Sequence, residues 1–216
     1  MKVVSLRLAL PTAILTVVFA AAGRAADTDT AAISERELQA KMQFCTYCHQ
    51  PSGQGFVGVS PIPRLAGQQT EYFENQLKAF IDRRRVNVFM SKVADSLNPE
   101  MLAALATHFR DLNPKPLEGA PKELVATGKK IFEDGVPGAH VPPCSTCHGP
   151  EAKGNGASPR LAGQLYPYII KILENWDKER GQDPADPDTS AVMAPIARGL
   201  TESQIKAVAA YLSYLE

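Results

Sequence analysis

The stretch CTYCH at residues 45–49 places two cysteines three positions apart, with a histidine directly after the second. The arrangement returns as CSTCH at residues 144–148, and the two stretches together contain all four cysteines of the chain. This spacing is typical of covalent haem attachment, in which both thiols form thioethers with one porphyrin and the histidine binds its iron. We therefore expect two haem c groups, one held by Cys45, Cys48 and His49 and the other by Cys144, Cys147 and His148.

Other uses of paired cysteines explain less of this pattern. Zinc sites built from two such pairs separate them by about 15–20 residues, whereas these pairs lie 99 positions apart. A thioredoxin-like redox pair accompanies a βαβ pattern, which the chain lacks. Two structural disulfides, common in secreted proteins, would leave the histidine after each pair unexplained. A redox-inactive zinc module remains as an alternative.

The first 25 residues have the features of a secretory signal peptide. Lys2 and Arg7 accompany an apolar run over residues 8–22, and the small residues Gly23 and Ala25 suit a cleavage site. We expect cleavage after residue 25 and a periplasmic protein, with an uncleaved anchor as the alternative. Without this segment, which holds three of the 23 basic residues and no acidic one, the chain has no basic surplus to suggest nucleic-acid binding.

The chain contains an internal duplication. The hexapeptide PRLAGQ at residues 63–68 recurs without change at residues 159–164. Equivalent positions elsewhere are offset by 99 or 103 residues, and such differences are expected where loops tolerate insertions. We expect two tandem domains, at residues 26–112 (the first half) and 122–216 (the second half), joined by a proline-rich linker at 113–121. The linker composition also fits an ordered extended strap.

Both halves are expected to be all-α. Capping boxes begin helices at Ser34 and Thr201, and Pro99 begins another. Amphipathic patterns predict helices over residues 70–83 and 167–178. The last helix of each half carries an apolar stripe, and the two stripes are Leu102, Leu105, Ala106 and Phe109, and Ile205, Val208, Ala209 and Leu212.

The sixth coordination position of each iron needs a donor that the repeat also supplies. Met90 and Met193 occupy equivalent positions, 41 and 45 residues after their histidines. A thioether is a soft, neutral ligand that favours ferrous iron and raises the reduction potential. We expect both methionines to bind iron. The alternative is that they fill the core, in which case His140 is the rival ligand.

Residues around the histidines are candidates to support the haem. A metal-bound histidine donates its second ring N–H to a fixed acceptor, and the carbonyls of Pro63 and Pro159 suit this role because proline holds its backbone rigid. Arg64 and Arg160, together with Tyr72 and Tyr168, are candidates to bind haem propionates. Solvated arginines and tyrosines packed in helix cores are the alternative.

The run Arg83, Arg84 and Arg85 precedes Met90 and has no equivalent of uniform charge in the second half. Most such runs are solvated faces. This one could also direct a haem edge toward an acidic partner.

These motifs together resemble the dihaem cytochrome c4 family, over the whole chain after the signal segment. The resemblance implies two all-helical cytochrome c domains whose haems face each other, in a periplasmic electron carrier. It implies a donor such as a quinol-oxidising complex and an acceptor such as a terminal oxidase, and it allows peripheral membrane association. The chain departs from the family pattern at Gln50, where glycine or alanine is usual, and in an Asp/Pro-rich loop at 182–190.

We predict one-electron transfer without catalysis, because the expected ligands fill both axial positions of each iron and the haem carries the chemistry. One alternative is a cytochrome subunit of a larger dehydrogenase, such as a sulfide-oxidising flavocytochrome. The other is a dihaem enzyme, either a peroxidase or a thiosulfate-oxidising cytochrome.

Overall fold

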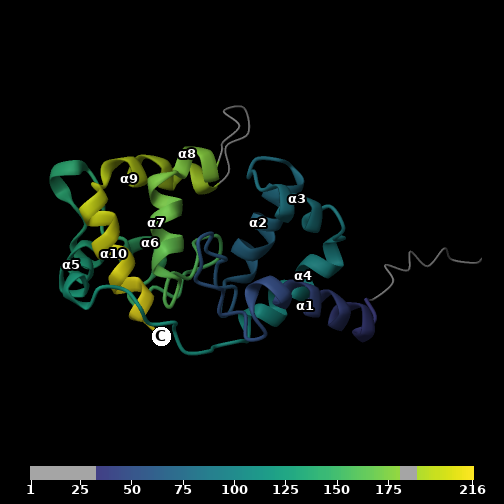
Figure 1. Cartoon of the computed structure of the whole chain (residues 1–216). Helices are drawn as coiled ribbons and strands as arrows, with labels where there is room; N and C mark the ends of the chain where they lie inside the picture. Colours follow the sequence, from purple (N-terminus) through teal and green to yellow (C-terminus); the bar gives the residue numbers. More distant parts are fainter. Residues whose placement is uncertain (1–32, 181–188) are drawn as a thin grey trace, which may run out of the picture. The chain divides into compact units, whose positions relative to one another are not determined.

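The computed structural model describes residues 33–180 and 189–216 (Figure 1). The expected signal peptide and residues 182–188 of the Asp/Pro-rich loop lie outside the described residues. In the first half, helices run over Glu35–His49 (α1), Thr70–Ile81 (α2), Val88–Ala94 (α3) and Pro99–Arg110 (α4). In the second half they run over Val125–Asp134 (α5), Ser145–His148 (α6), Tyr166–Glu174 (α7), Trp176–Glu179 (α8), Met193–Gly199 (α9) and Glu202–Tyr214 (α10).

Short 3₁₀ turns cover Lys122–Leu124, Pro137–Ala139 and Thr189–Val192. Extended pairing in the described ranges is limited to isolated antiparallel bridges, Phe56 with Ile62, Val136 with Val141 and Asn155 with Ser158. No helix in these ranges is long and apolar enough to cross a membrane.

The predicted helix starts are confirmed. Ser34 and Thr201 each form a complete capping box, in which side chain and backbone exchange hydrogen bonds with Glu37 and Gln204. Such a box satisfies two donors that the first helical turn leaves open. Asn98 caps α4 by accepting from the backbone N–H of Met101, and Pro99 occupies the first turn, where its missing N–H costs nothing.

The first half has a core of its own, formed mainly between α2 and α4. The stacked rings of Phe73 and Phe109 lie at its centre, 5.5 Å apart. The partly buried Met42, Cys45 and Met90 pack against it. Its buried residues include the whole predicted stripe of α4 and are Phe73, Leu77, Met101, Leu102, Leu105, Ala106 and Phe109.

A second, separate core forms where α5 and α7 pack on α10. Gly128 in α5 allows the closest approach, because a Cβ there would lie 1.9 Å from the carbonyl oxygen of Ala207 in α10. The predicted stripe of α10 is buried in this core or beside it. The buried residues are Ile131, Phe132, Ala152, Ala162, Ile169, Ala207, Val208, Ala209 and Leu212.

The connection over residues 113–121 is an ordered strap held at both ends. At its start, the Asn113 side-chain oxygen accepts hydrogen bonds from Arg64 and Arg160, each at 3.4 Å. Near its end, the Tyr214 hydroxyl donates to the carbonyl of Ala120 at 2.6 Å. The strap therefore contacts both halves, as the extended alternative required.

Two helix predictions were wrong in their ends. The helix expected over 167–178 breaks at Asn175, whose side chain donates to the Lys171 carbonyl and competes with the backbone ladder. Helix α7 therefore ends at Glu174 and α8 follows as a separate turn. The helix expected over 70–83 ends at Ile81, two residues before Arg83, whose φ is +61°.

Candidate haem sites

Each histidine of the repeated motif ends a helix. His49 is the last residue of α1 and His148 the last of α6, and both side chains are buried. The chain then turns away with positive φ, at Gln50 in the first half and at Gly149 in the second. This places the motif on a helix end directly followed by the loop that leads to PRLAGQ.

That loop brings the predicted prolines to the histidines. His49 Nδ1 lies 2.9 Å from the Pro63 carbonyl oxygen, and His148 Nδ1 lies 2.9 Å from that of Pro159. Gly55 allows the approach, because a Cβ there would lie 2.5 Å from the carbonyl oxygen of Ile62. Each half thus contains the one histidine–proline pair expected from the sequence.

The protonation of the histidines suits metal binding. Burial lowers the pKa of His49 and of His148, so both rings are neutral at pH 7. A neutral ring that donates its Nδ1 proton to a carbonyl keeps the Nε2 lone pair available for a metal. In each half the ring therefore has the tautomer that an axial ligand needs.

The cysteines remain available for thioether bonds. None of the four forms a disulfide; Cys48 and Cys147 are exposed, and Cys45 and Cys144 are half-buried. Burial raises the pKa of Cys45 and of Cys144 to about 11, which keeps these thiols protonated. Within the described residues, no group of three or more His, Cys, Asp or Glu side chains could hold a metal ion.

Buried polar groups fit a large anionic cofactor. Arg64 is 4% exposed, and its Nη1 atom has no hydrogen-bond partner among the described residues. A buried cation needs a compensating anion, and haem carries two carboxylates. Burial, together with the nearby Arg160, lowers the pKa of Arg64 to about 10.

A sequence model of the family described as cytochrome c matches residues 125–216. The chain is 38% identical over 176 residues to cytochrome c4 of Thiocapsa roseopersicina, an alignment that covers 79% of this chain and 86% of the relative. The chain belongs to the cytochrome c4 family. It is also similar to the solved structure of cytochrome c4 from Acidithiobacillus ferrooxidans, with a TM-score of 0.69, 37% identity, and coverage of 80% of this chain and 99% of that one.

A third relative is named for its electron donor. The thiosulfate dehydrogenase electron acceptor of Thiomonas intermedia is 35% identical over 173 residues, covering 78% of this chain and 77% of the relative.

Membership of the cytochrome c4 family confirms the expected fold of tandem all-α cytochrome c domains, the haem c cofactor and electron transfer with redox partners. It also confirms the prediction that the chain is a carrier and not an enzyme.

In this cytochrome c4 chain, the candidate axial methionines lie in two short helices that the sequence did not predict. Asn87 begins α3 by accepting from the backbone N–H groups of Phe89 and Met90. Met193 is the first residue of α9, and both methionines are half-buried. His140, the rival ligand, is exposed.

The three arginines of the run at residues 83–85 do not share one solvated face. Arg83 pairs with Asp95 at 2.6 Å on the surface. Arg85 instead turns inward, lies over the Phe80 ring at 4.5 Å and donates to the Tyr168 hydroxyl of the second half at 2.8 Å. The repeated tyrosine therefore contacts an arginine of the opposite half. Tyr72 likewise interacts with Arg180 of the second half. Burial alone would lower the Arg180 pKa, but Tyr72, Tyr168 and Glu179 together outweigh burial and raise this pKa above its ordinary value.

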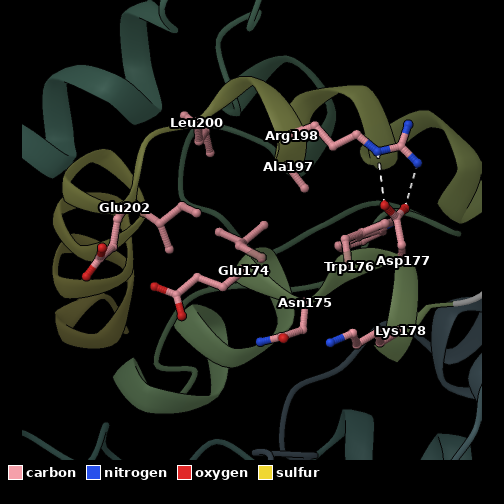
Figure 2. A pocket seen from close by; sticks show the side chains of 11 residues that line it. Glu174, Asn175, Trp176, Asp177, Lys178, Ala197, Arg198, Leu200 and Glu202 are labelled. Atoms are coloured by element: carbon pink, nitrogen blue, oxygen red, sulfur yellow. Dashed lines mark hydrogen bonds and ion pairs between the residues drawn. The ribbon is translucent and has the colours of Figure 1, made fainter.

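A groove in the second half of the cytochrome c4 chain lies apart from the predicted ligands (Figure 2). It is lined from α7, α8, α9 and α10, and Arg198 pairs with Asp177 across it. No cysteine, histidine or methionine of the haem prediction lines it.

The sequence did not predict the roles of Gln68, Gln164 and Asn113, which join the halves through hydrogen bonds. The identity of all six PRLAGQ residues was the available signal for the two glutamines.

Proposed function

We propose that this chain is a periplasmic cytochrome with two haem c groups that passes single electrons between respiratory partners. The observation that carries the proposal is the repeated pairing of a buried, neutral histidine with a proline carbonyl at 2.9 Å. It occurs once in each half, directly after a pair of free cysteines. One such site would support a single haem, and the repetition supports two.

The residues that would hold each haem follow from the repeat. Cys45 and Cys48, and in the second half Cys144 and Cys147, would form the thioether bonds. His49 with Met90, and His148 with Met193, would be the axial ligands. When bound, the haem iron supplies the one-electron chemistry by changing between the ferric and ferrous states.

The polar groups of the chain would hold the propionates and exclude water. Arg64 has a buried guanidinium nitrogen with no partner among the described residues, and Arg160 is buried to a similar degree. Tyr72 and Tyr168 would add hydroxyl donors from α2 and α7. A site with fixed charges and little water needs little rearrangement when one electron arrives.

A decisive experiment is the isolation of the protein from the periplasm, followed by mass measurement and an optically monitored redox titration. The proposal expects a chain that begins at residue 26 and carries two haems, both low-spin and both of high potential. A single haem, or a strongly negative potential at one site, would contradict the dihaem assignment or the methionine at that site.

The electron donor and acceptor can be tested against relatives. The Thiomonas relative is named as the acceptor of a thiosulfate dehydrogenase, which favours a dehydrogenase as donor. A terminal oxidase is the proposed acceptor. Stopped-flow reduction by a purified thiosulfate dehydrogenase and oxidation by a haem–copper oxidase would each be rapid and saturable. Reduction by the dehydrogenase without oxidation by the oxidase would support the proposed donor and contradict the proposed acceptor.

A further inference from the structure

One peptide group of the first half forms hydrogen bonds at both of its ends. The carbonyl between Pro63 and Arg64 accepts from His49 Nδ1 at 2.9 Å. The N–H of the same peptide, on Arg64, donates to the side-chain oxygen of Gln164 at 2.9 Å. The histidine of the first half is therefore linked to a glutamine of the second half through a single peptide plane.

The second half repeats the arrangement in the opposite direction. The Pro159 carbonyl accepts from His148 Nδ1 at 2.9 Å, and the Arg160 N–H donates to the side-chain oxygen of Gln68 at 2.7 Å. Each half thus supplies the glutamine that the other half's histidine–proline pair uses. The relationship is reciprocal and crosses the boundary between the halves twice.

Both glutamines are fixed by further hydrogen bonds. The Gln164 oxygen also accepts from the Leu165 N–H at 3.0 Å, and its Nε2 donates to the Arg64 carbonyl at 3.0 Å. Gln68 does the same with the Gln69 N–H at 2.9 Å and the Arg160 carbonyl at 3.2 Å. An atom that accepts two N–H groups must be oxygen, which settles the orientation of each amide. Both side chains are buried.

Hydrogen bonds in series strengthen one another. When a peptide N–H donates to a strong acceptor, its carbonyl oxygen becomes more negative and accepts more strongly. A stronger acceptor on Nδ1 makes the imidazole a more basic ligand. A more basic axial ligand stabilises ferric iron relative to ferrous iron and lowers the reduction potential.

We propose that Gln164 and Gln68 are positioning residues that tune the haem of the opposite half. Gln164 acts on His49 through the Pro63–Arg64 peptide, and Gln68 acts on His148 through the Pro159–Arg160 peptide. The inference rests on the proposed function, in which these histidines bind haem iron. It adds a chemical link by which each half adjusts the redox equilibrium of the other.

Gln69 provides a matched control for a glutamine that only holds the two halves together. The Gln69 side chain also crosses between the halves, donating to the carbonyls of Lys153 at 2.9 Å and Gly154 at 3.4 Å. Neither carbonyl accepts from a histidine ring in the described structure. Removing the Gln69 amide weakens the contact between the halves and leaves both histidine–proline peptides untouched.

The test compares Gln164→Met, Gln68→Met and Gln69→Met in the full haem-loaded protein. Methionine fills a similar volume and adapts its shape, but it provides no strong donor or acceptor. The reduction of each haem is followed separately by NMR of assigned haem methyl groups during a redox titration. Gln164→Met is expected to raise the equilibrium constant for reduction of the His49 haem by about 1.5- to 4-fold, with little change at the other haem.

Gln68→Met is expected to give the same change at the His148 haem, and Gln69→Met no change at either. Equal shifts at both haems, shifts confined to the substituted half, or a matching effect of Gln69→Met would each overturn the proposal. If the methionine variants do not fold, hydrogen exchange in the reduced natural protein decides: slow exchange at the Arg64 and Arg160 amides supports the link, and rapid exchange overturns it. A natural protein whose spectra lack histidine ligation would instead refute the proposed function.

Discussion

Gln50 and Gly149 follow the two histidines with almost the same backbone, φ 68° and ψ 154° at Gln50 and φ 77° and ψ 158° at Gly149. This conformation is essentially restricted to glycine, and another residue held in it stores about 1–3 kcal/mol of strain. The first half therefore bears a strain that the second half avoids. The departure from the family pattern at Gln50 has a structural cost.

Replacing Gln50 by glycine is expected to relieve this strain. We expect Gln50→Gly to raise the free energy of unfolding by about 1 kcal/mol, because the relief exceeds the added entropy of the unfolded chain. Chemical denaturation of the haem-loaded protein would measure it. The reverse control is Gly149→Ala, which adds a Cβ into open space and should destabilise by about 1–2 kcal/mol. A loss of stability in Gln50→Gly would contradict the assignment of strain.

Removing the thioether from Met90 or Met193 should affect one haem at a time. We expect Met90→Leu to abolish methionine ligation at the first haem and lower its potential by on the order of 100 mV, because the soft ligand that favours ferrous iron is lost. Optical spectra and a redox titration would show it. Met101→Leu is the control, since Met101 is buried in the first core and should leave both haems unchanged. Two unchanged haems in Met90→Leu would exclude this ligand.

The arginines of the run at residues 83–85 should differ in their effect on stability. Arg85→Ala is expected to cost about 2 kcal/mol, because it removes a charged donor from the half-buried Tyr168 hydroxyl and from the Gln76 side chain, to which Arg180 then remains as a donor. Arg83→Ala removes an exposed ion pair with Asp95 and should change stability little. Urea denaturation of both variants would compare them, and equal effects would contradict the inward position of Arg85.

The contact between α5 and α10 leaves no room for a side chain at Gly128. Gly128→Ala is expected to destabilise by about 3 kcal/mol, because its Cβ would meet the Ala207 backbone and the helices must separate. Gly138→Ala is the control, since a Cβ there meets nothing within 4 Å. Thermal unfolding would distinguish the two, and a neutral Gly128→Ala would show that the helices separate at little cost.

Local rules accounted for much of the fold. The capping boxes at Ser34 and Thr201 and the apolar stripes of α4 and α10 depend on residues within one helix, so the sequence predicts them well. The histidine–proline pairs also followed, because the requirement for a fixed acceptor is chemical and local. The break at Asn175 did not, since an asparagine side chain can equally point to solvent.

Contacts between the halves could not be predicted from the sequence of either repeat alone. The sequence assigned Arg64, Arg160 and Tyr168 to sites within their own half, whereas the structure gives each of them a partner in the other half or in the strap. Arg85 was expected on a solvated face because its neighbours in the sequence are charged. Its burial depends on where the second half packs, and no periodicity within the first half reports that position.

The glutamine of each PRLAGQ stretch hydrogen-bonds to the backbone of the other stretch. This reciprocal contact has the form of a twofold dimer interface, in which the same surface meets itself. A single half consequently carries a self-complementary surface. Produced without its partner, it is expected to pair with a second copy of itself through the same four backbone groups. In the natural chain, the strap raises the local concentration of the correct partner, so that the contact forms within one molecule and not between separate molecules. The sequences of the two halves can therefore differ without the loss of their pairing.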